Sequence, residues 1–268
     1  MKTIIYVRHN IDWRGMTFEK FMKQPRRFGP GGHIGDNVLV WFKNHNHILD
    51  LWNQIFNFGY FEFRAQAKEL AETSYRDVSV IRGRDALLKE CENPGNAYIV
   101  PIDDDDWLAP HLPQVLNDRK APIVHWTMRE TVNSRNTSSF RLPPHWFRSC
   151  SFAVTKNLIR KHSRLKTLLS HHVSAGFYLK RIRSRVTVKQ VLSVANRTVA
   201  SVGRMRRRYE SIKNRRRGDV REQFKRSMLR EAKRLSEKKT CGCDWAIPYM
   251  EQNALLHQKL IKCYPTML

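Results

Sequence analysis

The sequence lacks any uninterrupted apolar stretch of about 18 residues, the length that a membrane-spanning helix needs. The N-terminal residues Met1–Arg8 form a short strand-like run that is too brief for a signal peptide. We therefore expect a soluble, cytoplasmic protein. Hydrophobic residues make up 41% of the 268 residues, so the chain is not disordered by composition. It is long enough for one sizeable α/β domain, or for a domain with an extension.

Cysteine is scarce as well, with five residues, an odd number, and no paired Cys-x-x-Cys spacing. The paired spacing is typical of zinc sites, and a reducing compartment keeps thiols free. Cys241 and Cys243 form a close pair that could bind a soft metal, but one further Cys and one His follow them, a poor ligand set for zinc. We expect free thiols.

Acidic residues are few in the second part of the chain. Residues 1–150 hold 20 Lys and Arg against 17 Asp and Glu, whereas residues 151–268 hold 29 against 7. The stretch 156–239 alone carries 27 cations and 5 acids. The positive potential of so many cations attracts polyanions. We therefore expect a nucleic acid as the partner, with an anionic membrane as the second possibility.

Against this background, four consecutive carboxylates stand out at Asp103–Asp106, directly after the apolar run Tyr98–Ile102. Adjacent like charges oppose one another's ionisation unless a cation lies among them. Mg²⁺ or Mn²⁺ suits carboxylate oxygens, and Mg²⁺ is usually held by one or two carboxylates plus phosphate oxygens of a substrate. The apolar run fits a buried strand, and ligands bind at the carboxyl ends of strands in open α/β sheets. The alternative, a solvated acidic turn, does not explain the aromatic and apolar flanks.

The segment Gly95–Pro110 resembles the metal-binding segment of GT-A-fold glycosyltransferases. The resemblance implies an α/β fold with a GT-A-like, Rossmann-type mixed sheet flanked by helices, a nucleotide-diphosphate sugar as donor, and Mn²⁺ or Mg²⁺ as cofactor. Asp105 matches the metal-binding acid of the family. Asp103 matches the first acid, which faces the sugar nucleotide and is a second candidate metal ligand. Asp104 fills a variable slot beside the donor, and Asp106 is a weaker match.

Three arginines are candidates for contacts with the donor. Arg8 follows the strand-like run Thr3–Val7, in a turn that resembles that of rhamnosyltransferase-like members. Arg84 matches an arginine at the start of the helix before the metal-binding strand, and Arg197 lies where the family's closing loop folds over the donor phosphates. A guanidinium can bind phosphate oxygens through two hydrogen bonds. The alternatives are an exposed turn for Arg8 and a surface salt bridge for Arg84.

The catalytic base is not fixed by the resemblance. Residues 170–181 resemble the family's acceptor helix but lack its acidic pair. His171 or His172 is a candidate base, because an imidazole with a pKa near ~6.5 accepts protons at neutral pH. The histidines could instead complete a metal shell or cap a helix. Glu130 or Asp244 could serve from elsewhere, or the chemistry could be retaining.

We thus expect a GT-A-like domain at residues 1–203 and a basic helical extension at residues 204–268. The function expected is a metal-dependent glycosyltransferase whose acceptor is a hydroxylated base in DNA, flipped out of the helix. Two alternatives remain. One is a transferase acting on a cell-envelope or lipid-linked glycan. The other is a non-catalytic nucleic-acid-binding protein in which the four aspartates are structural.

Overall fold

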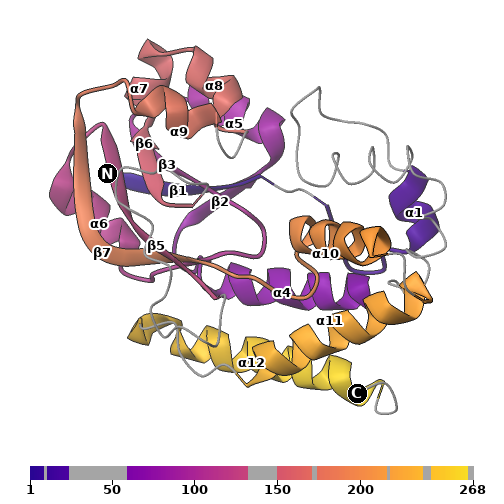
Figure 1. Ribbon diagram of the computed structural model, residues 1–268. Helices are drawn as coiled ribbons and strands as arrows, with labels where there is room; N and C mark the ends of the chain where they lie inside the picture. Colours follow the sequence, from indigo (N-terminus) through magenta and orange to yellow (C-terminus); the bar gives the residue numbers. More distant parts are fainter. Residues whose placement is uncertain are drawn as a thin grey trace.

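The computed structural model shows a mixed sheet of seven strands with helices on both faces (Figure 1), which confirms the predicted α/β class. The residues described are 1–8, 11–23, 59–131, 150–170, 174–215, 218–237 and 243–264. His171 and His172 lie outside them. The strands are β1 (Lys2–Val7), β2 (Ser79–Arg82), β3 (Ala97–Ile102), β4 (Trp107–Leu108), β5 (Ile123–Glu130), β6 (Phe152–Thr155) and β7 (Arg185–Ala195).

The helices lie between the strands along the chain or after the last strand. They are α1 (Phe18–Lys23), α4 (Tyr60–Thr73), α5 (Gly83–Glu92), α6 (Leu112–Arg119), α7 (Lys156–Lys161), α8 (Arg164–Leu168), α9 (Ser174–Leu179), α10 (Val202–Asn214), α11 (Val220–Ser236), the 3₁₀ turn η2 (Asp244–Ala246) and α12 (Ile247–Lys262). Among the described residues, no helix is both long enough and apolar enough to cross a membrane.

The strand order is β2-β1-β3-β6-β5-β7-β4. Strand β1 runs parallel to β2 and β3, β6 is antiparallel to both β3 and β5, and β5 is parallel to β7. Five strands, β1, β2, β3, β5 and β7, therefore point the same way, and their carboxyl ends share one edge of the sheet. This arrangement is consistent with the predicted GT-A-like fold.

Strand β3 lies inside the sheet because its sequence is apolar on both faces, as expected for a strand covered by helices on each side. All six of its residues are buried. Tyr98, Val100 and Ile102 pack on the side of α6 and α12, whereas Ala97 and Ile99 pack on the side of α5, α7 and α8. This alternation holds the strand in register, so the position of the acidic segment that follows it is fixed.

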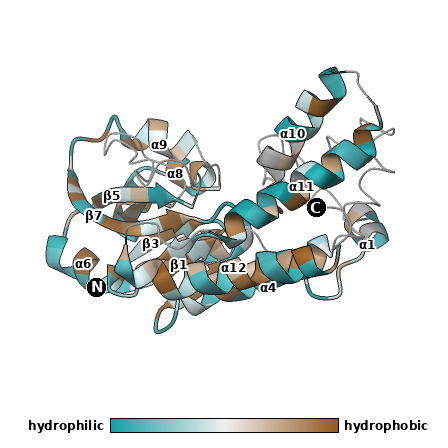
Figure 2. Ribbon diagram, turned by 60° about the horizontal axis from the view of Figure 1, so that its bottom comes forward, coloured by the Kyte–Doolittle hydropathy of each residue, from teal (hydrophilic) through white to brown (hydrophobic). Residues whose placement is uncertain are grey.

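A third hydrophobic cluster joins α4 to the C-terminal helices. Its members are aromatic and aliphatic side chains of α4, α10 and α11, including Tyr60, Phe63, Tyr209, Phe224 and Met228. This packing follows from five apolar residues spaced three or four apart along α11, of which all but the first are buried: Val220, Phe224, Met228, Ala232 and Leu235. In Figure 2, α12 lies beside α4, and α10 and α11 reach away from the sheet.

The last helix is attached to the sheet edge through the segment that precedes it. The indole Nε1 of Trp245 donates a hydrogen bond to the Val191 carbonyl at 3.0 Å. The ring of Tyr249 packs against Trp107, with ring centroids 5.8 Å apart. The C-terminal stretch therefore docks on β4 and β7. The domain boundary at residue 203 stays a prediction.

Candidate active site

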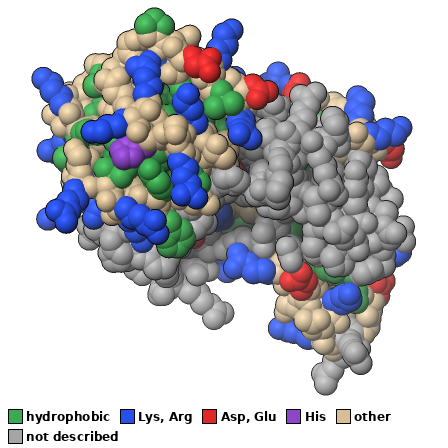
Figure 3. Space-filling view, turned by 90° about the horizontal axis from the view of Figure 1, so that it is seen from above, with side chains coloured by type: hydrophobic (Ala, Val, Ile, Leu, Met, Phe, Trp, Pro, Cys, Tyr) green, Lys and Arg blue, Asp and Glu red, His purple; other side chains and the backbone are tan. Residues whose placement is uncertain are grey.

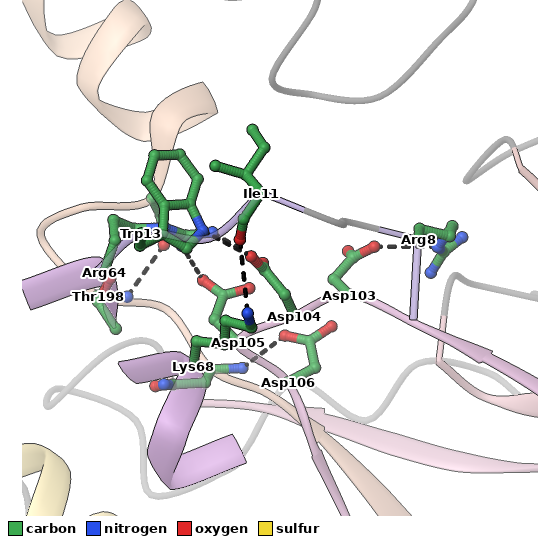
Figure 4. Close-up of polar contacts among 12 residues, drawn as sticks. Arg8, Ile11, Trp13, Arg64, Lys68, Asp103, Asp104, Asp105, Asp106 and Thr198 are labelled. Atoms are coloured by element: carbon green, nitrogen blue, oxygen red, sulfur yellow. Dashed lines mark hydrogen bonds and ion pairs between the residues drawn. The ribbon is translucent and has the colours of Figure 1, made fainter. Parts of the chain in front are cut away.

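Charged residues gather at the edge of the sheet where the parallel strands end. Arg8 follows β1, Asp103 follows β3, Glu130 is the last residue of β5, and Arg197 comes two residues after β7. Because these strands run in the same direction, side chains from four distant parts of the sequence meet at one edge. Figure 4 shows Arg8 facing Asp103, and Trp13 and Arg64 approaching the aspartates from the other side.

Asp103 pairs with Arg8. The Nε atom of Arg8 lies 3.0 Å from Oδ1 of Asp103, and the Arg8 side chain is 1% exposed. The backbone N–H of Arg8 also donates to the carbonyl of Ile102 at 3.0 Å, which continues the pairing of β1 with β3. Arg8 is therefore fixed by its backbone and by its side chain, and it holds the first carboxylate of the segment.

Asp104 and Asp105 share one guanidinium. Nη2 of Arg64 lies 2.8 Å from Oδ1 of Asp104, and Nη1 of Arg64 contacts Oδ2 of Asp105. Trp13 supports this pair on two sides: its Nε1 donates to Oδ2 of Asp104 at 2.9 Å, and its ring lies 5.4 Å from the Arg64 guanidinium carbon. Helix α4 thus brings a buried cation into the acidic segment, where aromatic packing holds it.

Asp106 turns toward the interior and connects the segment to β7. Its Oδ1 accepts a hydrogen bond from the backbone N–H of Asn196 at 3.0 Å. The hydroxyl of Tyr75 donates to the backbone carbonyl of Asp106 at 2.7 Å. The next residue of the β7 loop, Arg197, pairs with Glu130 at 2.8 Å. Asp106 therefore ties the acidic loop to the loop that carries Arg197.

The carboxylates crowd one another despite these partners. Burial raises the pKa of Asp105, the charge of Arg64 lowers it, and the charges of Asp104 and Asp103 raise it again. Burial raises the pKa of Asp106 well above its ordinary value, and the charges of Asp103 and Asp105 add to that effect. Burial opposes the charge of Arg64, but Asp105 and Asp104 outweigh it, so the pKa of Arg64 is raised. An additional cation at this edge would relieve the repulsion.

The carboxylates of the acidic segment are ligands of the kind that a divalent cation takes, and two of them reach solvent. The side chains of Asp103 and Asp105 are 12% and 14% exposed, whereas that of Asp104 is 1% exposed. The two carboxylates that reach solvent are those matched to the GT-A metal segment. Among the described residues there is no group of three or more His, Cys, Asp or Glu that could hold a metal by itself. A cation here would need further oxygens from a ligand, as Mg²⁺ commonly does.

The remaining predicted arginine, Arg84, also follows one of the parallel strands. Arg84 is the second residue of α5, and its charge acts on the hydroxyl of Tyr6, which lies 3.2 Å from Oγ of Ser170. Arg84 comes two residues after the end of β2, which is parallel to β1, and its contact with the donor stays a prediction.

Sequence reasoning missed Arg64 and Trp13. The signal for Arg64 was its spacing, because it lies on the same helical face as Tyr60, Ala67 and Ala71, all of which are buried. A cation on the buried face of a helix needs an acidic partner. Trp13 had no comparable signal, since it lies outside the helices and strands.

No family model and no curated protein matches this sequence. Two solved structures of S. aureus TarS are similar to the chain at a coarse level. The structure of TarS 1-349 has 11% identity and a TM-score of 0.34, with 98% of this chain and 72% of that one covered. A second TarS structure has 13% identity and a TM-score of 0.32, with 99% of this chain and 50% of that one covered. The likeness is too weak to support a function, so any function has to be argued from the geometry of the site.

Proposed function

We propose that this protein is a glycosyltransferase that takes a sugar from a nucleoside-diphosphate donor with the help of a divalent cation. The observation that carries the proposal is the acidic segment Asp103–Asp106 at the carboxyl end of the buried strand β3. Arginines from the ends of β1 and β7 flank that segment. Ligands of open α/β sheets bind at this edge.

Asp103 and Asp105 are the residues that would hold Mn²⁺ or Mg²⁺. Such a cation, when bound, stabilises the negative charge that develops on a departing diphosphate. The roles of the arginines follow from their positions. Arg8 and Arg64 hold the carboxylates of Asp103 and Asp105 in place, and both guanidinium groups are largely buried, with 1% and 7% of the side chain exposed. Their burial supports a role in orienting the acids, and direct contact of Arg8 with the donor stays a prediction.

Arg197 is the arginine best placed to reach the donor. Its side chain is 35% exposed, and Glu130 holds one of its nitrogen atoms. Its pKa is raised because the charges of Asp106 and Glu130 outweigh burial, so it stays charged. A guanidinium in this position can bind two oxygens of a diphosphate. The backbone N–H of Arg197 donates to Oγ1 of Thr131 at 2.7 Å, which fixes the loop.

For the proton of the acceptor hydroxyl, we propose Glu130 as the base. Its side chain is 17% exposed and lies at the end of β5, next to the proposed diphosphate position. A carboxylate at the site edge accepts a proton if the acceptor hydroxyl comes within hydrogen-bonding distance. His171 and His172 remain candidates from the sequence. For the acceptor we propose a hydroxylated base in DNA, because the charge of the chain favours a polyanion.

A second candidate function has one observation in its favour. All four aspartates have partners within the chain, and Arg64 neutralises two of them. A non-catalytic nucleic-acid-binding protein could use such a network to hold the loops at the sheet edge. Buried ion pairs like those of the four aspartates occur in purely structural networks as well as in active sites. The pairs alone are therefore weak evidence for catalysis.

Release of nucleoside diphosphate from UDP- and GDP-sugars separates the two candidates. We expect turnover with Mn²⁺ by the unmodified protein and a loss of about 10² or more in Asp105→Asn, as when one transition-state contact is removed. The matched control is Asp118→Asn on α6, an exposed acid, which should keep full turnover. If no nucleotide sugar is turned over, or if Asp105→Asn is as active as the control, the enzymatic proposal fails.

A further inference from the structure

A cationic surface lies on the helices that directly follow β6. We call residues 156–170 and 174–189 the α7–α9 lobe; it comprises α7, α8, α9 and the first half of β7. The lobe holds ten Lys and Arg and no Asp or Glu, and no acidic residue occurs anywhere between Glu130 and Glu210. No other part of the chain combines so many cations with so long a stretch without acids.

The packing of the lobe directs its cations outward. Its aliphatic side chains, among them Leu158, Ile159, Leu165 and Leu179, are buried against the sheet and α5. Two of its cations are tied inward: Lys156 pairs with Glu90 at 2.7 Å, and Arg160 donates to backbone carbonyls, including that of Gly95 at 2.9 Å. The exposed cations include Lys161, Arg164, Lys180, Arg181, Arg183 and Arg185. Figure 3 looks onto this side of the molecule and shows Lys and Arg side chains spread across it.

One aromatic side chain stands among these cations. Phe177 on α9 is 64% exposed, and the Nζ atom of Lys180 lies 5.5 Å from its ring centroid. A single exposed phenylalanine needs no explanation by itself. Here it lies among cations, and Ala175, Gly176 and Leu179 of the same helix are buried, so the ring is held at the surface. Cations that follow a phosphate backbone and an aromatic ring that stacks on a base are the two parts of a single-strand binding surface.

We propose that the α7–α9 lobe binds single-stranded nucleic acid, with its Lys and Arg on the phosphates and Phe177 stacked on an unpaired base. A duplex is disfavoured because its bases already stack on one another. A membrane is disfavoured because helices that lie on membranes present a broad apolar face, whereas the lobe exposes one large apolar side chain among the described residues. The inference deepens the proposed function, since a base offered as acceptor must first leave its stack. Binding by the lobe does not itself depend on the donor chemistry.

The test is fluorescence anisotropy of the full chain with a labelled single-stranded DNA of mixed sequence and with the matching duplex. Phe177→Ala is expected to weaken single-strand binding by roughly 10- to 100-fold, the usual effect of losing one stacked base. Its matched control is Leu255→Ala, since Leu255 on α12 is also exposed, at 55%. This control is expected to bind like the unmodified protein. With about five phosphate contacts, the affinity should fall by ~10² between 50 and 200 mM salt.

Two double variants that remove the same number of charges test whether the nucleic acid binds on the lobe. Arg181→Gln with Arg183→Gln removes two charges from the lobe, and Arg230→Gln with Lys233→Gln removes two exposed charges from α11. The lobe variant should lose at least ten-fold in affinity, and the α11 variant less than three-fold. Equal losses, or an unchanged affinity in Phe177→Ala, would overturn the proposal, as would binding to phosphatidylserine vesicles in the absence of DNA binding. Sugar-nucleotide turnover by the same variants is measured separately, so that failure of the enzymatic proposal is distinguishable from failure of this one.

Discussion

Replacing Arg64 with methionine leaves Asp104 and Asp105 without the cation that they share. Methionine keeps the apolar stem of the side chain and removes its charge. The Arg64 and Asp104 side chains are 7% and 1% exposed, so water cannot take the place of the guanidinium without opening the site. Removing one partner of a buried ion pair costs about 3–5 kcal/mol, because a charge stays buried without compensation. For a chain of about this size, the melting temperature should fall by roughly 6–20 °C.

The loss should depend on pH in a direction that the structure fixes. Burial already raises the pKa of Asp105 above its value of 3.8, and Arg64 is the group that opposes this rise most. Without Arg64 the folded-state pKa rises further. A carboxyl whose pKa is higher in the folded state than in the unfolded state stabilises the fold when protonated, and that stability is lost as the pH rises. The deficit of Arg64→Met should therefore be larger at pH 8 than at pH 5, as measured by urea unfolding followed by circular dichroism.

Two comparisons make this test sharp. Lys68→Met is the same substitution of a cation, one turn later on α4. The Nζ atom of Lys68 lies 3.9 Å from Glu72, and the Lys68 side chain is 18% exposed, so this substitution should cost less than ~1 kcal/mol of stability. Adding Asp104→Asn and Asp105→Asn to Arg64→Met should restore part of the lost stability, because no unpaired charge then remains. An Arg64→Met variant that is as stable as Lys68→Met, or equally impaired at both pH values, would refute this reasoning.

Three further predictions concern single side chains. Trp13→Phe keeps an aromatic six-membered ring but removes the donor to Asp104 at 2.9 Å, so we expect a loss of ~1.5–3 kcal/mol in urea unfolding at pH 7. Asp106→Asn removes a carboxyl whose pKa is raised by burial and whose ionisation destabilises the fold. The stability of this variant relative to the unmodified protein should therefore improve as the pH rises from 5 to 8, as measured by urea unfolding. Burial lowers the pKa of His257 from 6.5 to about 4, so the fold should lose roughly 3 kcal/mol as the pH falls through that window. His257→Gln should flatten this slope, and an unchanged slope would contradict the assignment.

The sheet and the position of the acidic segment could be predicted because they depend on local patterns. The run Tyr98–Ile102 is apolar at every position, which is the signature of a strand buried on both faces, and β3 is such a strand. The apolar residues of α11 also recur at a local spacing of three and four residues, and four of the five are buried. Arg8 and Asp103 directly follow β1 and β3, and because these two strands are parallel neighbours, the two side chains meet at the same edge of the sheet.

The partners of the acids could not be read in the same way. In the sequence, Arg64 is 40 residues from Asp104, and Trp13 is 91 residues from it. Contacts between residues so far apart produce no periodic pattern in the sequence. Their meeting depends on how α4 packs below the sheet, which is decided by tertiary contacts. Arg84 was expected from its family counterpart, and it follows the end of β2, where its charge and that of Arg8 both act on Tyr6; its contact with the donor stays a prediction.

The central claim, that the acidic segment holds a divalent cation together with a nucleoside diphosphate, is tested most directly by titration calorimetry with UDP and GDP in the presence and absence of Mn²⁺. The account predicts that one of them binds the unmodified protein and Asp118→Asn in a Mn²⁺-dependent way, and that Asp105→Asn loses this binding. Nucleotides that bind none of the three proteins, or that bind Asp105→Asn equally well with Mn²⁺, would contradict it.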